Sequence, residues 1–141
     1  MTNDSFQQSQ AITHGIHHLG LSVPDIEATA AFFITTLGYQ KVGEKPDYPA
    51  IFVSDGTVML TLWQVASPEN CRAFDCRENV GLHHFAMNVE SRAALKTLYL
   101  QFLELDCVDI EFAPESLGSS PMEHMMCLLP GGLRVEFIAA E

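Results

Sequence analysis

Two double histidines are the residues of this sequence whose spacing first suggests metal chemistry. One opens the segment HHLGLSV at His17 and His18, and the other opens HHFAMNV at His83 and His84. Side chains alternate between the two faces of a strand, so if both segments are strands, the histidines of each pair point in opposite directions. The face with the bulky apolar residues should pack on helices. His18 and His84 then lie on the opposite, open face, among small or polar neighbours.

A carboxylate joins them from the last apolar segment, LRVEFIAA. In a strand, Glu136 and Arg134 would share the open face, with bulky apolar residues on the other. A carboxylate flanked by apolar residues is costly unless it is paired or binds a metal. Two histidines and one carboxylate on a common face suit Fe(II), Mn(II) or another divalent ion. We therefore predict metal ligands at His18, His84 and Glu136.

The predicted ligands occupy equivalent positions of an internal repeat. The segment IHHLGLSV aligns with LHHFAMNV, and the fifth residue after Gly56, Thr61, aligns with the fifth residue after Gly131, Glu136. Self-similarity of this kind indicates a duplicated supersecondary unit. Thr61 therefore occupies the fourth symmetric position, where its hydroxyl would be a weak metal ligand.

Each copy of the repeat predicts one strand, one helix and three further strands. Asp25 and Ser91 are placed to cap the helices, which should end near Leu37, before Gly38, and near Leu105. The dipeptide DG predicts a two-residue turn before the last strand of the first copy, and PGG predicts a turn before the last strand of the second copy. Apolar spacing predicts strands over residues 16–23, 39–44, 50–54 and 57–65, and over residues 82–89, 108–113, 124–129 and 133–140. The expected buried faces of the helices are Ile26, Ala30, Phe33, Ile34 and Leu37, and Leu95, Leu98, Phe102 and Leu105.

The chain of 141 residues is expected to form one domain of the α+β class, with enough apolar residues, 48%, to bury a core. Its organisation follows from the repeat. We assign residues 1–13 to a polar tail, 14–65 to the first module, 66–80 to a linker and 81–141 to the second module.

Charge and composition exclude several classes of partner. The net charge is -11 and the chain has seven Lys and Arg residues, so neither nucleic acid nor an anionic membrane surface is an expected partner. Neither a membrane span nor a signal peptide is expected, which predicts a cytoplasmic protein. The four cysteines show no CxxC spacing, so neither a disulfide framework nor a structural zinc site is expected.

Several residues near the predicted ligands are candidates for a substrate pocket. We place Phe52, Met59, Thr61 and Trp63 in its wall, with ordinary core packing as an equally good interpretation. Arg134 would either grip a substrate carboxylate or form a salt bridge with an acidic side chain.

Four further polar residues, two histidines and two arginines, are not assigned to the metal site or to the pocket wall. His17 and His83, on the helix-packed side of their strands, are interpreted as structural. Arg72 and Arg77 of the linker would either reach over the pocket or be solvated.

At these residues the sequence resembles the vicinal oxygen chelate superfamily, which includes glyoxalase I, extradiol dioxygenases, methylmalonyl-CoA epimerase, and the fosfomycin and bleomycin resistance proteins. The resemblance covers about residues 14–140 and is carried by HHLGLSVPDIEATAAFFITTLGY, GLHHFAMNV and PGGLRVEF. It implies two βαβββ modules that curl into an open, funnel-shaped barrel, often in a homodimer. It also implies one divalent metal ion, with ligands that fall on His18, His84 and Glu136.

The resemblance leaves the reaction open. Glyoxalase-like members draw a fourth ligand, Glu or Gln, from the position that Thr61 occupies here, and Gln64 nearby has the wrong parity on a regular strand. Two histidines and one glutamate instead resemble the extradiol dioxygenases, which also use a second-shell histidine in acid-base chemistry. His124 is the candidate for that role, but a two-residue PG turn would point it away from Glu136.

The expected function is therefore a metal-dependent enzyme that chelates neighbouring oxygens of a small molecule. It would stabilise an oxyanion or activate oxygen, as a glyoxalase-like lyase or isomerase or as an Fe(II) dioxygenase, with Fe, Mn, Ni, Zn or Co as the metal. The alternatives are a metal-free binding protein of the bleomycin-resistance type and a regulatory module with a vestigial site.

Overall fold

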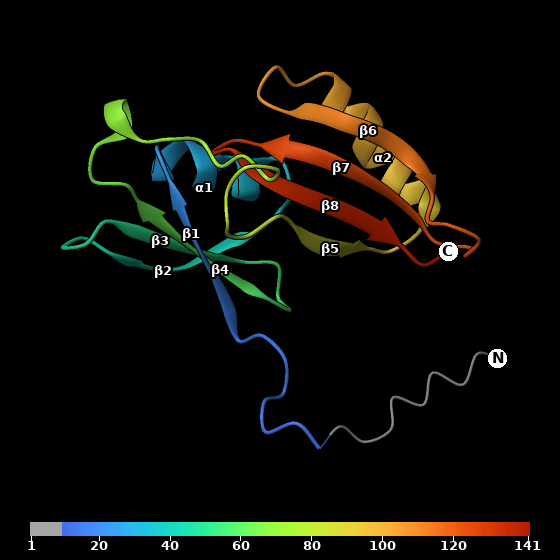
Figure 1. Cartoon of the computed structure of the whole chain (residues 1–141), viewed down its shortest axis with the longest axis horizontal. Coiled ribbons are helices and arrows are strands. Elements are labelled where there is room, and N and C mark those ends of the chain that lie inside the picture. The colour runs from blue at the N-terminus through green and yellow to red at the C-terminus, as the bar shows by residue number, and fades with distance from the viewer. Residues whose placement is uncertain (1–9) are drawn as a thin grey trace.

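The computed structural model describes residues 10–141, which form two sheets with one α-helix each, and a short 3-10 helix (Pro68–Asn70) between the modules (Figure 1). The first module contains β1 (His18–Val23), α1 (Ile26–Thr35), β2 (Gln40–Lys45), β3 (Ala50–Ser54) and β4 (Met59–Gln64). The second contains β5 (Phe85–Val89), α2 (Arg92–Leu103), β6 (Asp109–Ser116), β7 (Glu123–Leu129) and β8 (Leu133–Ala139). Most of the predicted polar tail, residues 1–9, lies outside the described residues. The predicted α+β architecture of two βαβββ modules is confirmed.

Both sheets have the same strand order. The first runs β1-β4-β3-β2 and the second runs β5-β8-β7-β6. In each, the first strand pairs in parallel with the last strand of its module, and the remaining pairs are antiparallel. Within residues 10–141 no strand pair joins the two sheets, so they do not close into a barrel. The sequence repeat is thus a repeat of one supersecondary unit.

Both helices begin at the predicted caps. The Asp25 side chain accepts a hydrogen bond from the Ala28 amide, and the Ser91 hydroxyl accepts one from the Ala94 amide, each at 3.0 Å. These bonds satisfy amide groups that have no partner inside the helix. Gly38 follows α1 with φ 75°, as expected of a helix terminator.

The expected buried face of α1 is wrong at one position. Ile34 is 37% exposed, whereas Thr29 and Phe32 are buried. The buried face is rotated because α1 packs on its own sheet and also against the second module, where the rings of Phe32 and Phe102 lie 6.0 Å apart. The position of the buried face therefore depends on a contact between modules that helical spacing does not encode.

The two modules share one hydrophobic core on the helix side of both sheets. It combines Val23, Phe33 and Leu62 of the first module with Leu95 and Phe102 of the second, all of them fully buried. The opposite faces, which carry the candidate site residues, are left open. No helix in the described part of the chain is long and apolar enough to cross a membrane.

Candidate functional site

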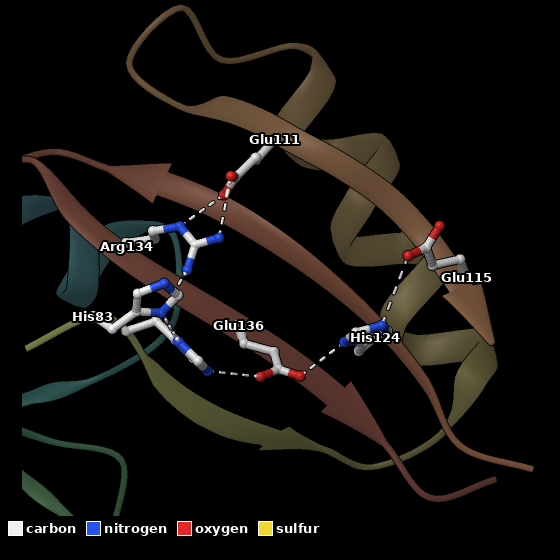
Figure 2. A network of polar contacts seen from close by, with 7 residues as sticks. His83, Glu111, Glu115, His124, Arg134 and Glu136 are labelled. Carbon is white, nitrogen blue, oxygen red and sulfur yellow. Dashed lines mark hydrogen bonds and ion pairs between the residues drawn. The ribbon is translucent and has the colours of Figure 1, made fainter. Parts of the chain in front are cut away.

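Glu136 lies on the open face of the second sheet, between two histidines (Figure 2). Its Oε1 atom is 3.2 Å from Nε2 of His84, and its Oε2 atom is 2.8 Å from Nδ1 of His124. The side chains of Glu136 and His124 are only 12% and 14% exposed, and that of His84 is 34% exposed. Both carboxylate oxygens are therefore engaged in a shielded setting, where a charge-assisted hydrogen bond is strong.

The strand register explains this geometry. Glu136 pairs with Ala86 on the parallel strand β5, and His84 comes two residues before Ala86, just ahead of the strand. On the other side, Glu136 pairs with Met126 of β7, and His124 comes two residues before Met126. Residues two apart on a strand share a face, so both histidines reach Glu136 from neighbouring strands.

The expectation that His124 would point away from Glu136 is wrong. It assumed a two-residue PG turn, but Leu129 pairs with Leu133, so Pro130, Gly131 and Gly132 all lie in the loop. Both glycines have positive φ, 95° and 73°, which suits them to this tight loop. One additional loop residue reverses the parity of β7 relative to β8, and this brings His124 onto the face of Glu136.

The polar network continues beyond His124. Its Nε2 atom is 3.8 Å from Oε1 of Glu115 on β6, and its ring packs edge-on against Phe112 at 5.0 Å between centroids. His124 thus lies between two carboxylates, one of which, Glu115, is largely exposed. The alternation of polar and apolar residues in DIEFAPES indicates that Glu115 lies on the polar face of a strand. Its contact with His124 could not be predicted, because β6 contains register shifts relative to β7.

At its other end the network reaches Arg134. The Nδ1 atoms of His84 and His83 lie 2.7 Å apart, and Nδ1 of His83 is 3.1 Å from Nη1 of Arg134. Arg134 also binds Glu111 of β6 through two hydrogen bonds, at 2.8 and 3.1 Å. The hydrogen bond to Glu111 raises the pKa of Arg134 above its ordinary value. Arg134 was predicted either to grip a substrate carboxylate or to form a salt bridge with an acidic side chain. In the structure it forms a salt bridge, with Glu111.

The first histidine of each pair is not packed on a helix as expected. His17 and His83 both lie ahead of their strands and are exposed. Each instead contacts the second histidine of its pair: Nδ1 of His17 is 2.9 Å from Nδ1 of His18. The two pairs therefore have the same local geometry, as a duplicated module should.

His18 and Thr61 lie on the first sheet, apart from the network around Glu136. His18 is exposed at the start of β1, and its side-chain contact is with His17. The buried hydroxyl of Thr61 accepts a hydrogen bond from Nε1 of Trp63 at 2.9 Å and lies 3.5 Å from the carbonyl oxygen of Leu19. Across residues 10–141, no three His, Cys, Asp or Glu side chains are grouped closely enough to hold a metal ion.

Aromatic side chains form a wall beside Thr61. The ring of Trp63 lies 6.0 Å from that of Phe52 and 5.1 Å from that of Tyr48, and Phe52 pairs with Thr61 across β3 and β4. The ammonium group of Lys45 lies 5.9 Å from the Trp63 ring, at the distance of a cation-π contact. Met59, the remaining predicted wall residue, is half-buried at the start of β4. Lys45 was not predicted, because its position depends on the β2–β3 hairpin.

Gln64 has a structural role at the start of α1. Its Oε1 atom accepts a hydrogen bond from the Ile26 amide at 3.0 Å, and its Nε2 atom donates to the carbonyl oxygen of Pro24 at 2.6 Å. It therefore ties the end of β4 to the connection between β1 and α1. This agrees with the predicted parity, which points Gln64 away from the open face.

A Gln64→Leu variant is expected to lose about 2 kcal/mol of unfolding free energy, because the part-buried Ile26 amide and the Pro24 carbonyl lose their side-chain partner. The control is Gln40→Leu, an exposed position on β2 that should change stability by less than about 0.5 kcal/mol. Urea unfolding followed by circular dichroism measures both. If Gln64→Leu unfolds like the parent chain but loses bound metal, Gln64 is a ligand and the structural role is wrong.

The comparisons with known proteins agree with this fold. Residues 15–137 match the family described as the Glyoxalase/Bleomycin resistance protein/Dioxygenase superfamily. No curated protein matches the chain. Lactoylglutathione lyase from Agrobacterium tumefaciens is a similar solved structure, with 22% identity, a TM-score of 0.68, and coverage of 92% of this chain and 96% of that one.

Two further solved structures are similar. A glyoxylase/bleomycin resistance protein/dioxygenase domain from Frankia has 16% identity and a TM-score of 0.75, with 92% of this chain and 93% of that one covered. A genomically encoded fosfomycin resistance protein from Listeria monocytogenes has 13% identity and a TM-score of 0.70, with 92% and 96% covered. At these sequence identities, the similarity shows a shared fold and nothing more specific.

Proposed function

The chain belongs to the glyoxalase/bleomycin resistance protein/dioxygenase superfamily, and we propose that it is a divalent-metal-dependent enzyme acting on a small molecule with two neighbouring oxygens. The observation that supports this proposal is the contact between His84 and Glu136 on the open face of the second sheet. Both residues are predicted ligands, and they are brought together by the parallel pairing of β5 and β8.

The spacing of these two donors fits adjacent ligands of one ion. Ligand atoms about 2.1 Å from a metal and at right angles to each other lie roughly 3 Å apart, and Nε2 of His84 is 3.2 Å from Oε1 of Glu136. Within residues 10–141 of one chain, no third His, Cys, Asp or Glu side chain lies close enough to these two to complete a metal site. The proposed third ligand is His18 of a second copy, whose open face would meet this one in a homodimer.

A homodimer of this kind has closed two-fold symmetry and contains two equivalent sites. Each site would take His18 from one subunit and both His84 and Glu136 from the other. The wall of Phe52, Met59, Thr61 and Trp63 lies on the same sheet as His18, so it would face the second sheet of the partner across a shared pocket.

The chain's own residues would divide the chemistry as follows. When bound, the metal ion would supply Lewis acidity to the two substrate oxygens, so that negative charge developing on one of them is stabilised. The hydrogen bond from Nδ1 of His124 to Oε2 of Glu136 holds the carboxylate in orientation. It also leaves Nε2 of His124 as the atom at which a proton is accepted or returned. The aromatic wall would exclude water from an apolar part of the substrate.

The reaction within the superfamily depends on the residue that moves the proton. Thr61 has a hydroxyl group and no side-chain carboxylate, and this hydroxyl already accepts a hydrogen bond from Trp63. This counts against a glyoxalase reaction that uses a fourth-strand glutamate. The contact between His124 and Glu136 provides an alternative acid-base group, which suits either an Fe(II) dioxygenase or a lyase with a histidine base.

A metal-free binding protein is the second candidate. One observation favours it: both oxygens of Glu136 already have histidine partners, so the network is complete without an ion. In that case the network is a structural element of the second sheet and the aromatic wall alone would bind the ligand.

Metal content distinguishes the two candidates. We expect chain purified without a chelating tag to contain about one divalent ion per subunit by mass spectrometry, and we expect His84→Ala to lose it because removing one of three ligands lowers affinity steeply. The control is His14→Ala, which alters an exposed histidine ahead of β1 and should retain the metal. Little metal in the parent chain, even after incubation with Fe, Mn, Ni, Zn or Co, would favour the binding protein.

A further inference from the structure

A cavity lies between the two modules, beneath the segment that links them. Its volume is about 630 Å³, within the range of small-molecule sites. Ser22 of β1, Arg72 and Phe74 of the linker, Leu82 ahead of β5, and Arg134 at the start of β8 are among the residues that line it. The predicted ligands His18, His84 and Glu136 do not line it.

The charge of this cavity differs from that of the rest of the chain. The sequence has 18 acidic and seven basic residues, yet two of the seven, Arg72 and Arg134, line this cavity and none of its described lining residues is acidic. The guanidinium group of Arg134 is held by Glu111. In the part of the chain that the structure describes, Arg72 has no hydrogen bond or ion pair. One arginine at the cavity is therefore available to an anion.

The rest of the lining is largely apolar. Phe74 and Leu82, which line the cavity, are 39% and 47% exposed, and two further lining residues, Phe85 and Leu133, are more buried. Large apolar side chains that remain exposed beside a concave surface are typical of a site that binds an apolar ligand. An occupant would thus need an anionic end near Arg72 and an apolar body.

We propose that this cavity binds a small organic acid, with its carboxylate on Arg72 and its apolar body against Phe74, Leu82 and Phe85. A planar guanidinium group binds a carboxylate through paired hydrogen bonds. The net charge of -11 repels anions in proportion to their charge, so a monoanion is favoured over a dianionic phosphate ester. The site is separate from the proposed metal ligands and does not require a metal.

The site is nevertheless connected to Glu136. Arg134 lines the cavity and also contacts His83, which contacts His84, which contacts Glu136. With its carboxylate on Arg72, a ligand in the cavity also lies near Arg134, which lines the same cavity. Occupancy of the cavity is therefore expected to change the surroundings of His83, which contacts Arg134, as well as those of the linker.

The test is a titration of metal-free protein in EDTA with phenylacetate, followed by calorimetry and by amide shifts in NMR spectra. We expect saturable binding with a Kd at or below about 1 mM, and shift changes that include Ala73, Leu82 and Gly132, which line the cavity. Arg72→Gln should weaken binding about tenfold, because a charge-assisted hydrogen bond is lost. Phenylacetamide, which has the same shape and no charge, and acetate, which has no apolar body, should each bind at least about tenfold more weakly.

The matched control is Arg77→Gln, the same change of charge in the same linker at a residue that does not line the cavity. It should leave the Kd of phenylacetate unchanged. Equal weakening in both variants, an unchanged Kd in Arg72→Gln, tighter binding of phenyl phosphate, shift changes confined to other parts of the chain, or no binding to the parent chain would each overturn the proposal. Since the assay contains no metal, its result is independent of the proposed enzymatic function.

Discussion

Mixing a His18→Ala variant with a Glu136→Ala variant is expected to restore about a quarter of the metal sites, although each variant alone should bind almost no metal. In the proposed homodimer, one site of a mixed dimer carries both substitutions and the other carries neither. Random mixing makes half of the dimers mixed, and half of their sites are intact. Co-expression of the two variants with different tags, followed by metal analysis, measures this fraction.

The control for this experiment is a mixture of His84→Ala with Glu136→Ala. Both residues belong to the second module, with His84 just ahead of β5 and Glu136 on β8, so they form the same half of each proposed site. Every site in the mixed dimer then carries one substitution, so no metal should return. Absence of recovery in the first mixture would mean that His18 and Glu136 of one chain act together, or that His18 is not a ligand.

A Gly131→Ala variant is expected to lose about 3 kcal/mol of unfolding free energy. A Cβ atom at this position would lie 2.9 Å from Cγ1 of Val23 and 3.0 Å from Oγ1 of Thr29. Both side chains are fully buried and have little room to move. Gly131 also has φ 95°, which is unfavourable for any residue with a Cβ atom. The unfavourable backbone conformation and the crowding of the added Cβ atom should therefore both lower the unfolding free energy of this variant.

Gly132→Ala separates these two causes. Gly132 has φ 73°, but a Cβ atom there meets nothing within 4 Å, so we expect a loss of only about 1 kcal/mol. Urea unfolding of both variants gives the difference. Equal losses in the two variants would mean that the contact of this loop with Val23 and Thr29 does not contribute to stability.

The β7–β8 loop thus performs two tasks in the fold. Its length sets the parity that brings His124 to Glu136, and Gly131 packs against the first module where β1 and α1 meet. A change in this loop is expected to affect both the candidate site and the packing of the modules. Proposals about the role of His124 are therefore best tested by substituting His124 itself.

Much of the fold was predictable from the sequence because its signals are local. Capping at Asp25 and Ser91, the glycine that ends α1, and the alternation of polar and apolar residues each depend on neighbours a few positions away. The repeat of the double histidine also identified the module that is duplicated. These features were confirmed, with shifts of a few residues at the ends of strands.

Contacts between strands could not be predicted in the same way. The pairing of Arg134 with Glu111 depends on the register of β6, which contains register shifts. The contact of His124 with Glu136 depends on whether the loop has two or three residues. One residue more or less reverses the face of every side chain on a strand, so a small error in a turn changes the composition of a site.

The sequence by itself determined the two modules, their helices and strands, and the open faces on which His18, His84 and Glu136 lie. Only the tertiary structure decided how these faces are grouped. The pairing of β5 with β8 inside the second module brings His84 to Glu136. The apolar helix sides of both modules pack into one core, joined by Phe32 and Phe102, and this leaves His18 on a separate sheet. The hydrophobic effect is not directional. The pattern of apolar residues therefore predicts that the two modules pack together, but it does not predict which polar faces meet.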